Sequence, residues 1–367
     1  MFVETDKQHN LKSRRAALQH IAGATIGGLT LTSANAPADE VKPQRRTGMG
    51  LVIYDCSIRR RRLRIESDGF DLFEPHIFLR HCHSLGAGGM QANLGVMTPV
   101  EIGQLRDFAD EHDMFIDAII KPPKDDADLS RFEAEIKTAR DVGVQAARTT
   151  IIPGRRYDRF KTLKEFREFE RRGQQMLERA TPIVEKHRVP FAVENHKDQR
   201  IEERIALFQH LDSEFIGACV DTGNSFALLD GAYEPIEALA PFAMTVHLKD
   251  QSLQEYEHGF QLGDIPLGQG SFDLKRMVDV IRKAKPKVRF ALELITRDPL
   301  KVPCLTDQFY ATMPTAPAKD LARAMRFVSD HPAELQQVSS LSVEQQVQLE
   351  DANVAASLEY AGKELGL

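Results

Sequence analysis

The sequence predicts an α/β protein, a (β/α)8 barrel with an added C-terminal helix. From Met49 onward, short β-rich runs alternate with longer segments of helical period, and eight such rounds follow one another. An open doubly wound sheet would need a Gly-rich nucleotide-binding turn after an early strand. GAGG, 86–89, is not that turn, because it follows a helical segment and precedes a strand. The closed barrel is therefore the favoured α/β architecture.

The elements follow one another along the chain. The expected strands cover 50–58, 88–94, 114–120, 144–151, 190–196, 216–222, 244–250 and 289–295. Between them lie helical segments at 75–86, 99–113, 129–143, 161–188 and 272–285. The segment 75–86 has Pro at its start and Gly at its end, as a helix prefers. Each expected strand is thus followed by enough chain for a crossover helix or loop.

The two ends of the chain differ from the barrel. Residues 1–36 combine Arg14 and Arg15, a short apolar stretch and a small-residue cleavage site. This order is typical of a twin-arginine export signal and predicts a periplasmic or otherwise extracytoplasmic protein; a basic tail without fixed structure is the alternative. The expected organisation is this signal over 1–36, a linker over 37–48, the barrel over 49–335 and a helical extension over 336–367.

After the Pro-rich loop 299–317, two helical stretches remain, and the second opens at Ser342 with a Ser-x-x-Gln capping box. We expect them to pack on the barrel or on a partner subunit in a homodimer.

Charge and cysteine content exclude several classes of function. The formal net charge of -6 argues against nucleic-acid binding. The apolar stretch of the signal is too short for a membrane span, so we expect no stable membrane insertion after its removal. The cysteines are scattered without metal-ligand spacing and are expected to be buried free thiols. They are Cys56, Cys82, Cys219 and Cys304.

A polar cluster is predicted where the last four strands end. In FAVENH, 191–196, the small-then-polar residues Ala192, Glu194 and His196 alternate with bulky ones and face the barrel axis. The next strands repeat this pattern with Cys219 and Asp221, with Thr245, His247 and Lys249, and with Ala291 and Glu293. These polar groups are expected to converge at the C-terminal mouth of the barrel.

Three carboxylates in a dry mouth would repel one another, and a divalent metal removes that cost. The expected ligands are Glu194, Asp221, His247 and Glu293. This oxygen-rich set with one nitrogen suits one Mn²⁺ ion best, with Mg²⁺, Co²⁺ or Zn²⁺ as alternatives.

The ordered motifs VENH, VDTGN, VHLKD and ALEL resemble the xylose isomerase-like barrel superfamily of sugar isomerases and epimerases. The resemblance covers most of the chain after the signal. It implies that Glu194 and Glu293 also exchange protons with the carbon next to a carbonyl, through an enediolate. His196 and Lys249 share the inward face and are expected either to contact substrate oxygens and move protons or to orient the ligands.

Gln91, Arg148 and Asn224 are the expected contacts for substrate hydroxyls. Gln91 and Arg148 lie near strand ends, and Asn224 stands where some ketose epimerases of the superfamily have a histidine. The abasic-site endonucleases that share this fold need additional histidines, which this sequence does not supply.

The segment 262–273 is expected as a loop that leads into a helix, and the Arg-rich segments 57–66 and 154–159 are expected as loops at the mouth. A solvated charge run is favoured there over a site for an acidic or phosphorylated sugar.

The resulting hypothesis is a metal-dependent isomerase or epimerase of a sugar or keto-sugar, with a small carbohydrate as its partner molecule. A lyase or dehydratase acting on a keto-sugar or 3-keto-glycoside shares the enolisation step and is the alternative. A non-catalytic carbohydrate binder ranks below both, and an endonuclease ranks last.

Overall fold

The computed structural model describes residues 45–152 and 154–367. The predicted export signal, 1–36, and residues 37–44 of the predicted linker lie outside the described residues. The remaining linker residues, 45–48, precede the first strand, and the N–H group of Arg46 donates to the Gly86 carbonyl over 2.8 Å. The Thr47 hydroxyl donates a hydrogen bond to the Leu367 carbonyl over 2.7 Å, so the start of the described chain contacts its last residue.

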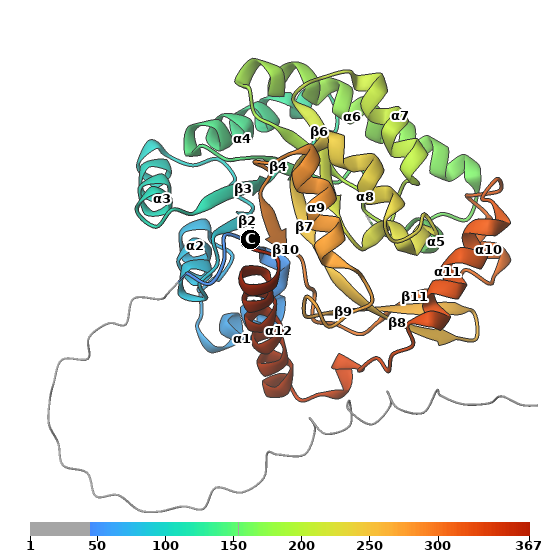
Figure 1. Ribbon diagram of the computed structural model, residues 1–367. Coiled ribbons are helices and arrows are strands. Elements are labelled where there is room, and N and C mark those ends of the chain that lie inside the picture. The colour runs from blue at the N-terminus through green and yellow to red at the C-terminus, as the bar shows by residue number, and fades with distance from the viewer. Residues whose placement is uncertain (1–44, 153) are drawn as a thin grey trace, which may run out of the picture. The chain divides into compact units, whose positions relative to one another are not determined.

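Parallel strands close into the predicted eight-stranded barrel (Figure 1). Strands β1 to β7 follow one another around the ring in chain order, and β10 closes it between β7 and β1. The barrel strands are β1 (Gly50–Val52), β2 (Gly89–Ala92), β3 (Phe115–Ile119), β4 (Ala147–Thr149), β5 (Phe191–Glu194), β6 (Ile216–Asp221), β7 (Ala243–Leu248) and β10 (Phe290–Leu292). Because all run the same way, their C-terminal ends meet at one mouth.

Helices follow the strands and cover the outside of the barrel (Figure 1). They are α1 (Ser57–Glu66), α2 (Pro75–Ser84), α3 (Pro99–Glu111), α4 (Leu129–Val142), α5 (Arg156–Arg159), α6 (Leu163–His187), α7 (Ile201–Leu211), α8 (Glu234–Leu239), α9 (Leu274–Ala284), α10 (Asp307–Tyr310), α11 (Ala318–Asp330) and α12 (Val343–Glu364). Capping boxes begin α3 at Thr98 and α6 at Thr162. Within the described ranges, no helix has the length and apolar character needed to cross a membrane.

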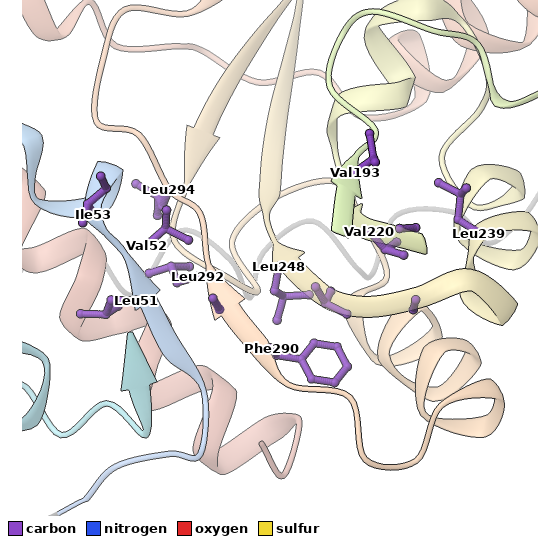
Figure 2. Close-up of a cluster of buried hydrophobic side chains, with 14 of the residues drawn as sticks. Leu51, Val52, Ile53, Val193, Val220, Leu239, Leu248, Phe290, Leu292 and Leu294 are labelled. Carbon is purple, nitrogen blue, oxygen red and sulfur yellow. The ribbon is translucent and has the colours of Figure 1, made fainter. Parts of the chain in front are cut away.

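The apolar core lies between the strands and the helices. Figure 2 shows part of it, with Val193, Val220, Leu248 and Leu292 on successive barrel strands. A smaller cluster inside the barrel contains Ala146, Ala192 and Cys219, so small residues lie beneath the mouth as the alternation predicts. All four cysteines are buried and free, which confirms that expectation.

The floor of the barrel is filled by the ring of Phe115. A Cβ atom on Gly89 would overlap this ring, and one on Gly50 would do the same. Glycine at these two positions therefore lets an aromatic ring close the barrel below the polar groups.

The first expected strand is shorter than predicted, and the Arg-rich segment after it is a helix rather than a loop. Asp55 accepts hydrogen bonds from the Val52 and Leu294 N–H groups over 2.9 and 2.7 Å, which turns the chain after β1. The segment 57–66 then forms α1, and its arginines pair with neighbouring acids, as Arg60 does with Asp71 over 2.6 Å. These pairs agree with a solvated charge run.

A second sheet of three strands is formed by segments that follow β7 and β10 in the chain, and it corrects two further predictions. The expected strand 244–250 is divided between β7 and β8 (Asp250–Tyr256). The expected loop 262–273 begins in β9 (Gly259–Ile265), which pairs antiparallel with β8 and with β11 (Leu300–Val302).

A single carboxylate holds the loop after β9 in place. Asp250 accepts hydrogen bonds from the N–H groups of Gly268 and Gly270 over 2.9 and 3.0 Å, and Gln251 and Phe272 donate to it as well. A Cβ atom on Gly270 would overlap the Asp250 carboxylate, so glycine is required for this close approach.

The C-terminal helices have different neighbours. Helix α11 packs on β8 and β9, whereas α12 packs against α1. Val354 and Leu358 of α12 belong to the main core cluster. Glu350 of α12 accepts hydrogen bonds from the N–H groups of Ile58 and Arg59, each over 2.8 Å, and so caps the N-terminus of α1.

Candidate metal centre

The four predicted ligands come together at the mouth of the barrel. Glu194 ends β5, Asp221 ends β6, His247 lies in β7, and Glu293 directly follows β10. The strand register places Asp221 opposite His247. One ligand atom of each residue lies within 4.8 Å of the others, and all four side chains are buried. Four donor groups on adjacent parallel strands thus face one small volume.

The donor chemistry of this cluster fits a divalent cation. His247 Nε2 lies 2.8 Å from Gln91 Oε1, which only accepts, so Nε2 carries the proton and Nδ1 points to the cluster. His247 Nδ1 lies 3.6 Å from Glu194 Oε2 and 3.5 Å from Glu293 Oε2. Nδ1 is buried without a hydrogen-bond partner among the described residues, and Asp221 Oδ2 is buried with the Lys249 ammonium 3.0 Å away. Carboxylate oxygens around an imidazole nitrogen are the ligand set of a hard or borderline divalent ion.

Burial and neighbouring charges perturb the acids of the cluster in opposite directions. Burial raises the pKa of Asp221 to about 6, although Lys249 opposes this shift. Burial also acts to raise the pKa of Glu293, but Lys249 and His247 outweigh it and hold that pKa well below its usual value. Glu293 is therefore the more firmly ionised of the two in the metal-free chain.

Asn195 fixes the position of Asp221. Its side-chain oxygen accepts the Asp221 N–H over 2.7 Å, and its amide nitrogen donates to the Asp221 carbonyl over 2.9 Å. Asp221 Oδ1 accepts the N–H groups of Gly223 and Asn224 over 2.9 and 2.7 Å. One carboxylate oxygen is thus held by backbone donors, and the other is directed into the cluster.

The three predicted substrate contacts each hydrogen-bond to a member of the cluster. Gln91 binds His247, as described above. Arg148 Nε donates to Glu194 Oε2 over 2.6 Å, and Asn224 Nδ2 donates to Glu194 Oε1 over 3.0 Å. These contacts show that the three residues hold the ligand side chains, and contact with a substrate stays a prediction for them.

The two further predicted catalytic residues occupy different places. Lys249 lies inside the cluster, with Nζ 2.7 Å from Glu293 Oε2 and 3.0 Å from Asp221 Oδ2. His196 is half-buried and lies beside the chain that follows β4, with Nδ1 3.2 Å from the Gly154 carbonyl. The structure therefore brings Lys249, but not His196, into contact with the ligand carboxylates.

The structure also brings in charged residues that the sequence did not single out. Lys197 is buried, and its ammonium group donates to Asn224 Oδ1. Asp264 of β9 accepts from Gln251 Nε2 over 2.8 Å and from Arg297 Nη2 over 3.0 Å. Asp264 and Arg297 also line a cavity of about 330 Å³ beside α12.

A second layer of hydrogen bonds lies beneath the histidine. Asp117 of β3 accepts the Thr245 hydroxyl over 2.6 Å and the Ala146 N–H over 3.0 Å. Burial raises the pKa of Asp117 to about 6, and the hydrogen bonds from Thr245 and Ala146 partly offset this shift.

One curated protein resembles part of the chain. The 3-oxo-isoapionate decarboxylase of Pectobacterium atrosepticum is 26% identical over 120 residues, which are 32% of this chain and 44% of the decarboxylase. The match therefore spans less than half of that relative's length.

Solved structures share the fold at low sequence identity. L-ribulose 3-epimerase has a TM-score of 0.52 at 13% identity, covering 87% of this chain and 94% of its own. D-psicose 3-epimerase has a TM-score of 0.50 at 12% identity, covering 79% and 93%. The 3-keto-D-glucoside 4-epimerase from E. coli has a TM-score of 0.50 at 10% identity, covering 77% and 99%.

The family model described as "Xylose isomerase-like TIM barrel" matches residues 79–330, which is more than half of the chain. Together with the closed parallel barrel, this match shows that the chain belongs to the xylose isomerase-like TIM barrel family.

Proposed function

We propose that this protein is a divalent-metal-dependent isomerase or epimerase of a sugar or keto-sugar. The observation that carries the proposal is the buried cluster of Glu194, Asp221, His247 and Glu293, whose ligand atoms lie within 4.8 Å of one another. The names of the three structural relatives, all sugar epimerases, support the same substrate class. We propose Mn²⁺ as the ion.

The chain's own residues suit enolisation next to a carbonyl. A bound divalent cation would supply Lewis-acid polarisation of the ketose oxygens. Glu293 is the better placed proton acceptor, because Lys249 donates to one of its oxygens, whereas Arg148 and Asn224 take both oxygens of Glu194. Lys249 can stabilise negative charge that develops on the substrate oxygen, since its ammonium lies within the same cluster.

Exchange of carbon-bound hydrogen in D₂O tests the proposal. Mn²⁺-loaded protein is incubated with a panel of ketoses and 3-keto-glycosides, and deuterium uptake is followed by NMR. We expect uptake with the unchanged protein and none with Glu293→Gln, which removes the proton acceptor but keeps its shape. Absence of uptake across the panel, with one metal bound per chain, would contradict enolisation of these sugars.

A lyase is the second candidate. The partial similarity to a 3-oxo-isoapionate decarboxylase favours it, because loss of a group next to a ketone passes through the same kind of enolate. The products of the exchange experiment separate the two candidates. An epimer or isomer of unchanged mass supports the first, and a product lighter by water, an aglycone or carbon dioxide supports the second.

We also propose that the protein acts outside the cytoplasm. This rests on Arg14, Arg15 and the following apolar and small-residue stretches of the sequence. Replacing both arginines by lysine is expected to retain the protein in the cytoplasm, as cell fractionation would show. Equal export of the variant would contradict the twin-arginine route.

A further inference from the structure

Within residues 45–152 and 154–367, the buried ammonium group of Lys197 has no carboxylate partner. The residue is 2% exposed, and its described hydrogen bond goes to the neutral Asn224 Oδ1. Among the described residues, no Asp or Glu oxygen lies within 4.0 Å of its Nζ, whereas Lys249 has two such oxygens at 2.7 and 3.0 Å. The two lysines share the Asn224 oxygen, so this one amide faces two ammonium groups.

The other charges around the mouth are paired. Arg148 pairs with Glu194, Arg297 pairs with Asp264, and Lys249 lies between Asp221 and Glu293. A buried ammonium without a counter-charge is costly. Burial, and then the charges of Lys249 and Arg297, lower the pKa of Lys197 to about 8, because the charged form has no negative partner. A negative charge placed beside Lys197 would supply that partner.

We propose that Lys197 binds the carboxylate of the substrate, so that the enzyme acts on a keto-sugar acid rather than on a neutral sugar. This inference rests on the proposed function. One unpaired ammonium matches the single charge of a carboxylate better than the two charges of a phosphate dianion, because the other cations around the mouth are already paired. Asp264 and Arg297, whose charges act on Lys197, both line the cavity of about 330 Å³ described above.

Binding of unreactive probes tests the proposal without turnover. D-Gluconate and D-glucitol have the same number of carbons and differ in the carboxylate. Titration calorimetry on metal-free and on Mn²⁺-loaded protein is expected to show gluconate bound at least tenfold more tightly, the effect of one charge-assisted hydrogen bond. Lys197→Met should abolish the preference. Lys121→Met, an exposed lysine after β3, is the matched control and should preserve it.

Thermal unfolding confirms that the variant is folded and gives an independent readout. Without ligand, Lys197→Met should unfold at a higher temperature than the unchanged protein, because an unpaired buried charge has been removed. Lys197→Arg should keep part of the preference for gluconate. Equal affinity for gluconate and glucitol, or a preference that survives in Lys197→Met, would overturn the proposal.

Binding of a sugar phosphate distinguishes a carboxylate site from a phosphate site. D-Glucitol 6-phosphate should bind more weakly than gluconate, and the reverse order would overturn the carboxylate assignment. The deuterium exchange experiment tests the proposed function separately. If neutral keto-sugars exchange deuterium and gluconate is not preferred, the proposed enolisation stands and the role of Lys197 is rejected. If gluconate is preferred but no keto-sugar exchanges deuterium, the role of Lys197 stands and enolisation is rejected.

Discussion

His247 donates its Nε2 proton to Gln91 over 2.8 Å, and this contact directs Nδ1 toward the carboxylates of the cluster. A residue that the sequence suggested as a substrate contact thus determines which nitrogen of the histidine faces the proposed metal.

Replacing Gln91 by methionine should weaken metal binding. The variant keeps the volume but loses the acceptor for Nε2–H, so either ring nitrogen can carry the proton. Loss of such an orienting partner typically lowers metal affinity 10–100-fold. Titration calorimetry with Mn²⁺ measures the change, and Gln145→Met, at the opposite end of the barrel, is the control. An unchanged Mn²⁺ affinity in Gln91→Met would show that the hydrogen bond does not orient the ligand.

Removal of metal should lower the thermal stability of the protein. Three carboxylates lie together at the mouth, and an ion that binds only the folded state stabilises it by about 2.7 kcal/mol at a concentration 100 times its Kd. Calorimetric unfolding after EDTA treatment and after addition of Mn²⁺ measures this effect. Asp221→Asn, which removes one ligand charge, should respond much less. A shift of equal size in that variant would place the stabilising ion elsewhere.

The contact between Glu350 and α1 should make stability depend on pH. Burial raises the pKa of Glu350 to about 7, although hydrogen bonds from Arg59 and Ile58 oppose this. A carboxyl whose pKa is higher in the folded state contributes stability below its unfolded pKa of 4.5, and this contribution is lost as the pH rises through 7. Between low and high pH, this pKa shift changes the free energy of unfolding by on the order of 3 kcal/mol.

Glu350→Gln should therefore be most destabilising near pH 5 and least near pH 8. Denaturant unfolding at several pH values measures the trend, with Glu214→Gln, at an exposed position before β6, as control. A penalty that grows with pH would mean that the ionised form of Glu350 is the stabilising one.

Gly270→Ala should release the loop that surrounds Asp250. The added Cβ atom would overlap the Asp250 carboxylate and separate it from its backbone donors, at a cost of roughly 1–3 kcal/mol. Hydrogen exchange in 266–272 should accelerate. Gly103→Ala, in the interior of α3 with open space around it, should instead be neutral or stabilising. Unchanged exchange in Gly270→Ala would show that the loop adapts without losing these hydrogen bonds.

The sequence could predict the four cluster residues because strand geometry is regular. Side chains alternate with a period of two, so Ala192 and Glu194 share one face, and parallel strands in a barrel end at the same mouth. The same two rules apply to Asp221, His247 and Glu293. The contacts of Gln91 with His247 and of Arg148 with Glu194 were not accessible in this way, because they join residues 156 and 46 positions apart.

Lys197 and Asp264 were missed for a different reason. Strand β5 ends at Glu194, so alternation no longer assigns a face to Lys197, and the turn that brings it back to Asn224 is set by tertiary contacts. Asp264 lies in a segment predicted as a loop. Its place beside Arg297 depends on pairing of β9 with β8 and β11, and the loop that follows β9 is held by Asp250, so only the folded hairpin determines it.

The hydrogen bonds between Glu350 and the start of α1 affect the order in which the chain folds during synthesis. The backbone groups that Glu350 caps lie 292 and 291 residues earlier, and β1 has its second neighbour in β10. A nascent chain that has not yet extended beyond residue 342 therefore has an uncapped first helix and lacks Val354 and Leu358 in its core. Contacts of such large sequence separation form slowly. The first βα unit should thus acquire protection from proteolysis only after the last helix has left the ribosome.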